Sequence, residues 1–250
     1  MQSLEQELWD LLSARGVEVL GLAPARAMTG APAGLGPGDL LPGAAGLVCL
    51  GLPVPRGLFL AGQRGLALYW RAANVLYRKL DALALETGNR LEARGGLALP
   101  VPGCFPYDYQ GKGRFTGYIS LTCLAWACGL GQLGANGLLF HHRHGPRLIL
   151  AGVLTTLELE PRAWPETSAQ GCPPGCRVCQ EACPVQALSG QGLVDAPVCT
   201  KASTRSPLFA HLLRAGAVGA GQDAMLNLTT AVDDHSWYTC IQCVAACPKP

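Results

Sequence analysis

Charged side chains are scarce in this 250-residue sequence: 14% of the residues are Asp, Glu, Lys or Arg, and the formal net charge is +2. No run of five basic residues occurs. Proteins that bind nucleic acid through its phosphates usually present a dense basic patch. The composition gives no sign of such a patch, and we expect no nucleic-acid partner.

Sequence signals for nucleotides and for export are also missing. The glycine-rich residues 30–46 lack the G-x-G-x-x-G spacing of a dinucleotide site, and there is no P-loop. The first ten residues are acidic, the opposite of a signal or transit peptide. We therefore expect a cytoplasmic protein.

One stretch is apolar enough to raise the question of a membrane span. Residues 117–140 carry no charged side chain and are long enough to cross a bilayer. Several glycines, Gln132 and Asn136 interrupt them. This pattern predicts a buried helix over 118–130 and a glycine-containing turn over 131–137, with no membrane association.

The rest of the N-terminal part alternates between helix-like and strand-like patterns, which predicts a layered α/β or α+β domain. Helices are expected over 2–15 and 66–94, and strands over 17–22, 47–52, 97–101 and 146–156. Pro161 and Pro165 predict a linker over 160–169. We place the domain boundary there, between residues 1–163 and 164–250.

Cysteine is abundant, with twelve residues. The pattern C-x2-C-x3-C-P occurs twice, and two further cysteines accompany it; the eight are Cys172, Cys176, Cys179, Cys183, Cys199, Cys240, Cys243 and Cys247. Eight cysteines in this order are the ligand set of two [4Fe–4S] clusters, as in bacterial two-cluster ferredoxins. The third cysteine of each run lies across a helical turn, so it ligates the other cluster, and the proline after it ends the turn.

This logic assigns the eight cysteines to two sets. One cluster takes Cys172, Cys176, Cys179 and Cys247, and the other takes Cys183, Cys199, Cys240 and Cys243. Three residues separate Cys172 from Cys176 where two are usual, so the spacing specifies Cys172 least. A zinc site needs no third cysteine followed by proline, and a disulfide framework is typical of small secreted chains.

Some other residues allow a functional and a structural interpretation. The loop 102–114 contains Asp108 and has the composition of an active-site loop or of an ordinary surface loop. The group His141, His142 and His144 could bind a metal, but adjacent histidines point in different directions, and we expect a solvated turn. Cys123 and Cys128 are expected to be small buried core residues.

A longer stretch carries a family resemblance. Residues 127–139 read ACGLGQLGANGLL and are similar to the A-G-L-G-x-x-G-K-N-x-L-L stretch of epoxyqueuosine reductases and their relatives. Neighbouring blocks at 118–121, 145–147 and 153–156 and the order of the eight cysteines also match. The resemblance implies a modified nitroreductase-like domain joined to a ferredoxin-type two-cluster domain.

The resemblance also implies a cofactor and a chemistry. In epoxyqueuosine reductases and reductive dehalogenases a corrinoid lies between the two domains and receives electrons through the clusters. The residues expected to line its pocket here are Gly131, Gly134, Asn136 and Gly137. Flavin is the alternative cofactor, because nitroreductase-type folds often hold it.

The sequence departs from the family at two places. Ala135 stands at the family's lysine, and the segment 100–104 has no acid where the family has its catalytic aspartate. We also expect no counterpart of the family's helical repeats that help to hold tRNA. Asp108 is the nearest acid, at a different offset. We therefore expect an oxidoreductase acting on a small molecule and supplied by an external ferredoxin-type or flavodoxin-type donor. The alternative is an electron-transfer or corrinoid-handling accessory protein.

Overall fold

The computed structural model describes residues 3–104, 108–109, 115–164, 171–205, 237–238 and 240–248. Its elements follow one another along the chain as α1 (Leu4–Ala14), β1 (Val19–Pro24), η1 (Ala25–Ala27), α2 (Pro37–Leu40), β2 (Gly46–Pro53), α3 (Gly57–Leu60), α4 (Gly62–Glu92), β3 (Ala98–Val101), β4 (Asp108–Tyr109), β5 (Phe115–Thr116), α5 (Leu121–Ala127), β6 (Gln132–Leu133), β7 (Leu139–Phe140), β8 (Leu148–Thr155), β9 (Arg162–Trp164), α6 (Val178–Glu181), α7 (Ala196–Ser203), β10 (Thr204–Arg205), β11 (Trp237–Tyr238) and α10 (Gln242–Ala245).

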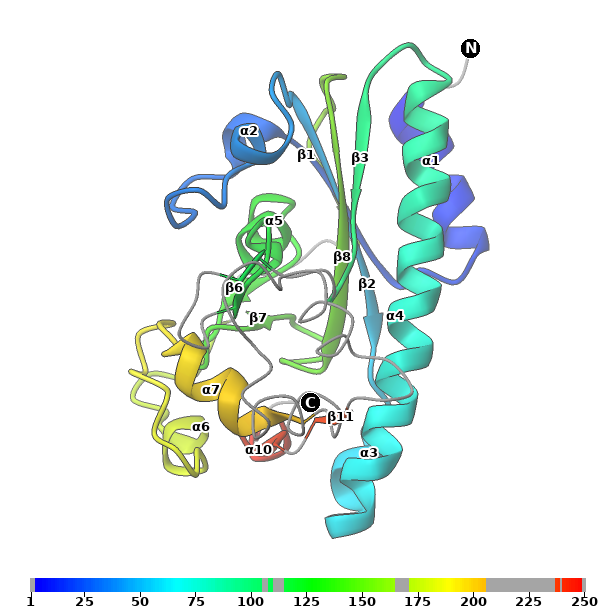
Figure 1. Cartoon of the computed structure of the whole chain (residues 1–250). Helices are drawn as coiled ribbons and strands as arrows, with labels where there is room; N and C mark the ends of the chain where they lie inside the picture. The colour runs from blue at the N-terminus through cyan, green and yellow to red at the C-terminus, as the bar shows by residue number, and fades with distance from the viewer. Residues whose placement is uncertain are drawn as a thin grey trace, which may run out of the picture.

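A five-stranded antiparallel sheet forms the centre of the molecule, with strand order β3-β8-β2-β1-β9 (Figure 1). The longest pairing joins β2 to β8, from Gly46 opposite Thr155 to Pro53 opposite Leu148. The chain is thus a mixed α/β protein, as the alternating sequence pattern predicted. The helix predicted over 66–94 and the strands predicted at 47–52 and 146–156 are confirmed, with small shifts at their ends.

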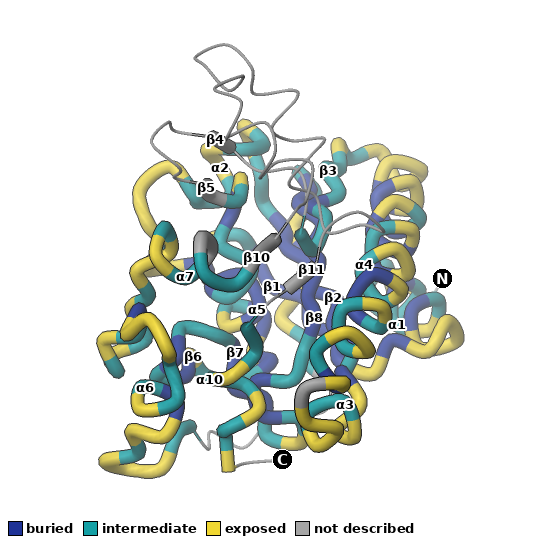
Figure 2. The backbone as a smooth tube through the Cα atoms, turned by 60° about the horizontal axis from the view of Figure 1, so that its bottom comes forward, coloured by how far each residue is buried: buried dark blue, intermediate teal, exposed yellow. Residues whose placement is uncertain are grey.

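Helices cover both faces of this sheet (Figure 1). On one face, α1 and α4 pack on Leu20, Val48 and Leu50, whereas on the other α5 packs on Val19 and Cys49. Successive side chains of a strand point to opposite faces, and both sets are buried in β1 and β2 (Figure 2). A strand buried on both faces reads as a continuous apolar run, which explains why 47–52 alternates so little.

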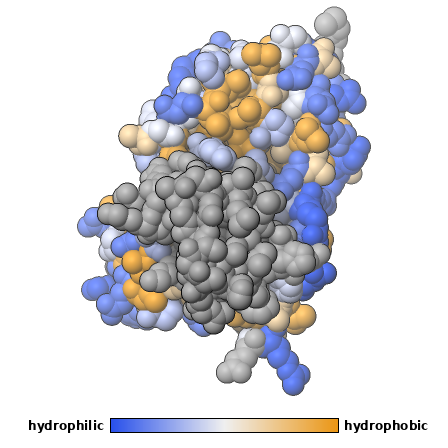
Figure 3. All heavy atoms as spheres, in the orientation of Figure 1, coloured by the Kyte–Doolittle hydropathy of each residue, from blue (hydrophilic) through white to orange (hydrophobic). Residues whose placement is uncertain are grey.

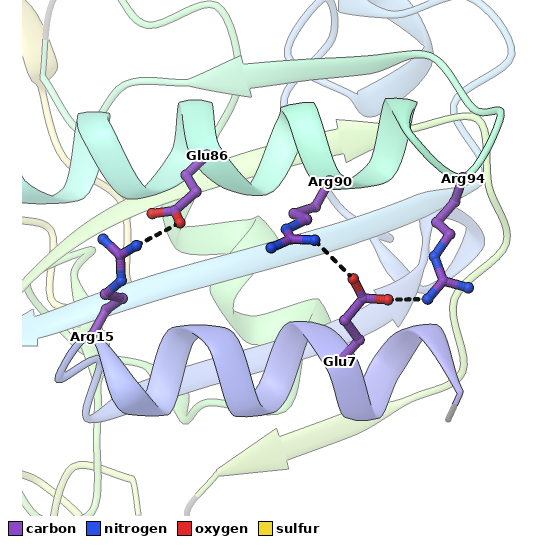
Figure 4. Close-up of polar contacts among 5 residues, drawn as sticks. All are labelled: Glu7, Arg15, Glu86, Arg90 and Arg94. Atoms are coloured by element: carbon purple, nitrogen blue, oxygen red, sulfur yellow. Dashed lines mark hydrogen bonds and ion pairs between the residues drawn. The ribbon is translucent and has the colours of Figure 1, made fainter. Parts of the chain in front are cut away.

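Ion pairs join the outer surfaces of α1 and α4 (Figure 4). Arg15 Nη2 lies 2.9 Å from Glu86 Oε1, and Glu7 pairs with Arg94 and, at 3.5 Å, with Arg90. Exposed pairs of this kind stabilise by about 0–1 kcal/mol each. The buried leucines beneath them therefore hold α1 and α4 in place.

Two predicted segments have different outcomes. The uncharged residues 117–140 form the short buried helix α5 followed by the β6–β7 hairpin, as expected. Throughout the described ranges, every helix is too short or too polar to cross a bilayer. The linker predicted over 160–169 instead contains a strand, because β9 (Arg162–Trp164) pairs with β1 and extends the sheet. The prolines flank this strand without preventing it, since edge strands tolerate them.

Candidate metal centres

The two C-x2-C-x3-C runs have the same local structure. In each, a helix of four residues, α6 or α10, begins directly before the middle cysteine, which is Cys179 in one and Cys243 in the other. The residue before each helix and the residue after it have nearly the same backbone angles in both runs. α6 and α10 also contact each other. The repeat in the sequence is therefore a repeat in structure, and its two copies are neighbours.

Four cysteines from both runs surround one cavity. They are the set predicted for one cluster, Cys172, Cys176, Cys179 and Cys247. The remaining lining residues are Ala135, Asn136, Phe140, Pro146, Pro173, Val178 and Pro248. The structure thus brings Cys247 to the other three across 68 residues of sequence, counted from Cys179. This arrangement includes Cys172, the position that the spacing specified least.

The other four cysteines also lie within electrostatic reach of one another. The pKa of the Cys243 thiol is raised to about 12, first by burial and then by the nearby thiols of Cys199, Cys240, Cys179 and Cys183. Burial likewise raises the pKa of Cys199, with Cys240 and Cys183 adding to the effect. The predicted second set is therefore grouped around Cys243. Cys179 of the first set is close enough to act on the same thiol.

Backbone N–H groups point at two of the sulfurs. Ala187 donates to Cys183 Sγ at 3.3 Å, and Ala135 donates to Cys172 Sγ at 3.4 Å. Such hydrogen bonds stabilise thiolates and influence the potentials of iron–sulfur clusters.

These thiols are spaced more widely than the ligands of a single metal ion. Within the part of the chain that is described, no group of three or more His, Cys, Asp or Glu side chains is close enough to hold a single metal ion. A cubane cluster instead distributes four thiolates over four iron atoms. Each of the two groups contains cysteines from both runs, and their wider spacing is compatible with a cubane cluster.

Of the predicted cofactor residues, Gly134, Asn136 and Gly137 lie between β6 and β7, and Gly131 lies directly before β6. Ala135 and Asn136 line the cavity with the cysteines. Gly137 has φ +74°, and a Cβ there would lie 2.4 Å from Val194 Cγ2. A Cβ on Gly131 would lie 2.3 Å from the Phe140 carbonyl oxygen. At both positions the chain's own atoms occupy the space, so these glycines permit tight packing of the hairpin rather than close approach of a ligand.

The other candidates lie in different elements of the fold. Asp108 lies in β4, opposite Thr116 of β5, while residues 105–107 and 110–114 of its loop are outside the described residues. Cys123 and Cys128 are buried at 7% and 2% exposure, which confirms them as core residues.

The expectation of a solvated histidine turn was wrong for His141, which is 0% exposed. Its ring lies 4.5 Å from that of His142 and 5.1 Å from that of His144, between centroids. Its Nδ1 accepts a hydrogen bond from the Arg143 N–H at 3.2 Å, whereas its Nε2 has no described partner. The pKa of His141 is lowered to about 3, first by burial and then by the nearby His142, His144 and Arg143. His141 is therefore neutral at physiological pH.

Sequence reasoning missed three polar residues near these groups. The Asp81 carboxylate accepts a hydrogen bond from the Gly103 N–H at 3.1 Å, next to Cys104. Burial raises the pKa of Tyr69 to about 12, with smaller effects from Cys104 and Cys243. Arg147 is close enough to Cys247 to interact electrostatically. All three act on residues distant in the sequence, so no local motif could have indicated them.

The chain is similar in sequence to two groups of reductases, although no protein-family model matches it. It is 29% identical to epoxyqueuosine reductase of Gloeobacter violaceus over 214 residues, which cover 84% of this chain and 58% of the relative. It is 36% identical to a tetrachloroethene reductive dehalogenase of Desulfitobacterium hafniense over 85 residues, which cover 30% of this chain and 15% of the relative. The chain thus spans well under two thirds of either relative.

Solved structures share the fold. An epoxyqueuosine reductase from Streptococcus thermophilus aligns with TM-score 0.59 and 20% identity, covering 99% of this chain and 66% of its own. Another, in complex with an epoxyqueuosine-modified tRNA-Tyr stem loop, aligns with TM-score 0.51 and 20% identity over 79% of this chain and 56% of its own. A reductive dehalogenase aligns with TM-score 0.50 and 17% identity over 74% of this chain and 27% of its own. This chain is therefore similar in sequence to epoxyqueuosine reductases and, over a shorter stretch, to reductive dehalogenases, and it shares their fold.

Proposed function

We propose that this protein is an iron–sulfur reductase in which two [4Fe–4S] clusters pass electrons to a corrinoid held by the N-terminal domain. In this proposal residues 164–250 form the ferredoxin-type domain and residues 1–163 the nitroreductase-like domain. The reduced substrate is a small molecule, and the reaction takes place in the cytoplasm, where thiols stay reduced.

One observation carries the proposal. Cys247 of the C-terminal run lines the same cavity as Cys172, Cys176 and Cys179. Ligation across the two runs is a property of two-cluster ferredoxins, whose last cysteine of each run serves the other cluster. Single-run zinc sites do not require it.

The residues present suit such a cluster chemically. Each set contributes four thiols, and a backbone N–H donates to one sulfur in each set. When bound, the clusters supply one-electron transfer. The chain's own part is to hold the thiolates, to donate these hydrogen bonds and to limit the access of water, since Cys179 is 9% exposed.

The choice of a corrinoid rests on the relatives and on the hairpin. One structural neighbour, a reductive dehalogenase, is linked to B12-dependent dehalogenation. Ala135 and Asn136 lie beside the first set of cysteines, so a cofactor bound at this hairpin would be adjacent to a cluster. Flavin is the alternative that the same experiment tests.

An external one-electron donor, of ferredoxin or flavodoxin type, completes the scheme. The cysteine-rich segment itself carries exposed apolar side chains, among them Val178 at 36% and Val185 at 39%. Figure 3 shows apolar surface on this side of the molecule, over α6 and α7. Electron-transfer encounters use small interfaces, and exposed apolar side chains beside a cluster suit such an interface.

Two alternatives follow from specific observations. The tRNA stem loop held by one structural neighbour makes a modified RNA nucleotide the second substrate class. The lack of an acid in 100–104 favours an accessory protein that handles electrons or corrinoid without substrate chemistry of its own.

The test is anaerobic purification of the full chain with cobalamin and with flavin offered separately, followed by absorption spectra and iron and cobalt analysis. About eight iron atoms per chain with stoichiometric cobalt is the expected result. The same iron content with neither cofactor retained would support the accessory protein. Iron below half of that value would overturn the proposal. Retention of an epoxyqueuosine-containing tRNA stem loop by the loaded protein would replace the small-molecule substrate with RNA.

A further inference from the structure

Arg147 is held firmly at the start of β8. Its Nη1 donates a hydrogen bond to the Val54 carbonyl oxygen at 2.8 Å. Its own carbonyl accepts from the Val54 N–H at 2.9 Å, and its N–H donates to the His144 carbonyl at 3.1 Å. Val54 is 2% exposed and belongs to the core. The guanidinium is therefore fixed to the core rather than free in solvent.

This fixed cation lies next to the first set of cysteines. The preceding residue, Pro146, lines the cavity together with Cys247. The charges of Arg147 and Cys247 interact, and a second arginine, Arg56, is close enough to Arg147 to oppose its charge. In the described ranges, neither arginine forms an ion pair with a carboxylate. The positive charge beside Cys247 is thus not neutralised by a described acid.

The second set of cysteines has different described surroundings. The groups that act electrostatically on Cys199 and Cys243 are other thiols, and a hydrogen bond from Ser203 also acts on Cys199. A cation therefore lies beside the first predicted cluster, whereas the described groups that act on Cys199 and Cys243 of the second include no cation. The two clusters would have different electrostatic environments although their ligand patterns are the same.

We propose that Arg147 raises the reduction potential of the cluster held by Cys172, Cys176, Cys179 and Cys247. The inference rests on the proposed function, because it needs that cluster. A [4Fe–4S] cluster with four thiolates carries net negative charge, and reduction adds one further electron from the donor. A cation fixed nearby stabilises the more negative, reduced form more than the oxidised form. Arg147 is partly buried, so solvent screens this effect less than at an exposed site.

Arg147 thereby influences which of the two clusters holds an added electron. With its charge in place, the cluster of the first set is reduced more easily than the same cluster without it. The charge thereby shifts the sharing of an electron toward the cluster beside Ala135 and Asn136, the hairpin residues proposed to adjoin the cofactor.

The test is a redox titration, monitored by electron paramagnetic resonance, of the anaerobically purified full chain. The variants are Arg147→Gln, which removes the charge, and Arg147→Lys, which keeps it. Arg143→Gln is the matched control, because Arg143 is an exposed arginine four residues before Arg147, between β7 and β8, and its described hydrogen bond to His141 comes from its backbone. Iron analysis of every variant establishes that both clusters are present.

We expect Arg147→Gln to lower the equilibrium constant for reduction of one cluster about tenfold, which is about 59 mV for one electron, and to leave the other cluster unchanged. Arg147→Lys should keep most of the wild-type potential, and Arg143→Gln all of it. Unchanged potentials in an Arg147→Gln protein with full iron would overturn the inference and leave the proposed function intact. Wild-type protein without cluster iron would overturn the proposed function itself. If Arg147→Gln fails to retain iron, Arg147→Met is titrated in its place. If Arg147→Met also loses iron while Arg147→Lys keeps it, the positive charge is needed for cluster assembly, and the proposed effect on the potential is wrong.

Discussion

The backbone N–H of Ala135 donates a hydrogen bond to Sγ of Cys172, with 3.4 Å between nitrogen and sulfur. Ala135 belongs to the β6–β7 hairpin, and Cys172 opens the cysteine-rich segment 37 residues later. The contact directs Cys172 toward the cavity that it shares with Cys176, Cys179 and Cys247. The longer spacing before Cys176 is therefore compatible with a ligand at Cys172, because the hairpin supplies a partner for its sulfur.

The first prediction follows for iron content. Cys172→Ala should reduce iron from about eight to about four atoms per chain, since a cubane cluster is held by four cysteines. Cys183→Ala should remove the other cluster to the same extent. Cys123→Ala, a buried thiol on α5, is the control and should keep all the iron. Iron analysis after anaerobic purification measures the effect.

The outcomes separate two errors. Full iron in Cys172→Ala would show that this cysteine is not a ligand and that the cluster finds its fourth thiolate elsewhere. Full iron in Cys183→Ala would contradict the division of the eight cysteines into two crossed sets.

A second prediction concerns the packing of the hairpin against the cysteine-rich segment. A Cβ at Gly137 would lie 2.4 Å from Val194 Cγ2 and 3.1 Å from the Gly192 carbonyl oxygen. Gly30 has the same φ of +74°, but a Cβ there would meet nothing within 4 Å. Gly30→Ala should therefore cost only the left-handed backbone strain, about 1 kcal/mol. Gly137→Ala should cost roughly 1–3 kcal/mol more, through overpacking.

Chemical denaturation of the anaerobic protein gives both free energies of unfolding. Gly137→Ala should also lower iron retention, because it pushes Val194 and its segment away from the hairpin, whereas Gly30→Ala should not. Equal losses of stability in the two variants would mean that the contact with Val194 does not constrain the fold.

The sequence predicted what depends on local pattern. The long helix was predicted because apolar residues recur at helical spacing from Leu66 onward, and α4 is observed over Gly62–Glu92. The grouping of the cysteines was predicted because their spacing reflects a short helical turn that both runs form. Where a local rule specifies the element, the prediction and the structure agree, whereas the ligand role of the cysteines stays a prediction.

Long-range pairing explains what the sequence could not predict. Arg162–Trp164 is a strand because β1, about 140 residues earlier, offers a sheet edge for it. The burial of His141 is a separate case, because the four-residue stretch HHRH reads as polar and yet its first residue is 0% exposed. The guanidinium of Arg147 is held in place by a hydrogen bond to the carbonyl oxygen of Val54, 93 residues away. Neither β1 nor Val54 is visible in a short window around the residue that it contacts.

A third prediction concerns Asp81, whose carboxylate accepts from the Gly103 N–H. Burial raises the pKa of Asp81 from its ordinary 3.8, and this hydrogen bond partly opposes the rise. A carboxyl whose pKa is raised by folding stabilises the fold when protonated, so this contribution is lost as pH rises from about 3.8 through the raised pKa. At neutral pH the charged Asp81 therefore costs stability.

Asp81→Asn keeps an oxygen for Gly103 but carries no charge. We expect it to be more stable than the wild type at pH 7 by about 0.5–1 kcal/mol, a small value because Asp81 is partly exposed. The difference should shrink toward pH 4. Asp81→Ala, which also loses the hydrogen bond, should be less stable than Asp81→Asn at every pH. A difference between wild type and Asp81→Asn that does not change with pH would contradict the assignment.

The last prediction follows from the buried His141. Its pKa is lowered from the ordinary 6.5 to about 3, first by burial and then by His142, His144 and Arg143. The unfolded chain takes up a proton near pH 6.5, whereas the folded chain does so only near pH 3. The fold is therefore at its full stability above pH 6.5 and loses stability as pH falls between these values, by at most about 1.4 kcal/mol per pH unit.

His141→Gln removes this titration. At pH 7.5 we expect the variant to be less stable than the wild type, since it loses ring packing with His142 and His144. Between pH 6.5 and 5.5, however, the wild type should lose roughly 1 kcal/mol more than the variant. The two pH series are compared as differences, so the shared acid sensitivity of the clusters cancels. Parallel pH dependence in both proteins would mean that His141 is protonated within the fold, and that its neutral, buried state is not what limits stability in mild acid.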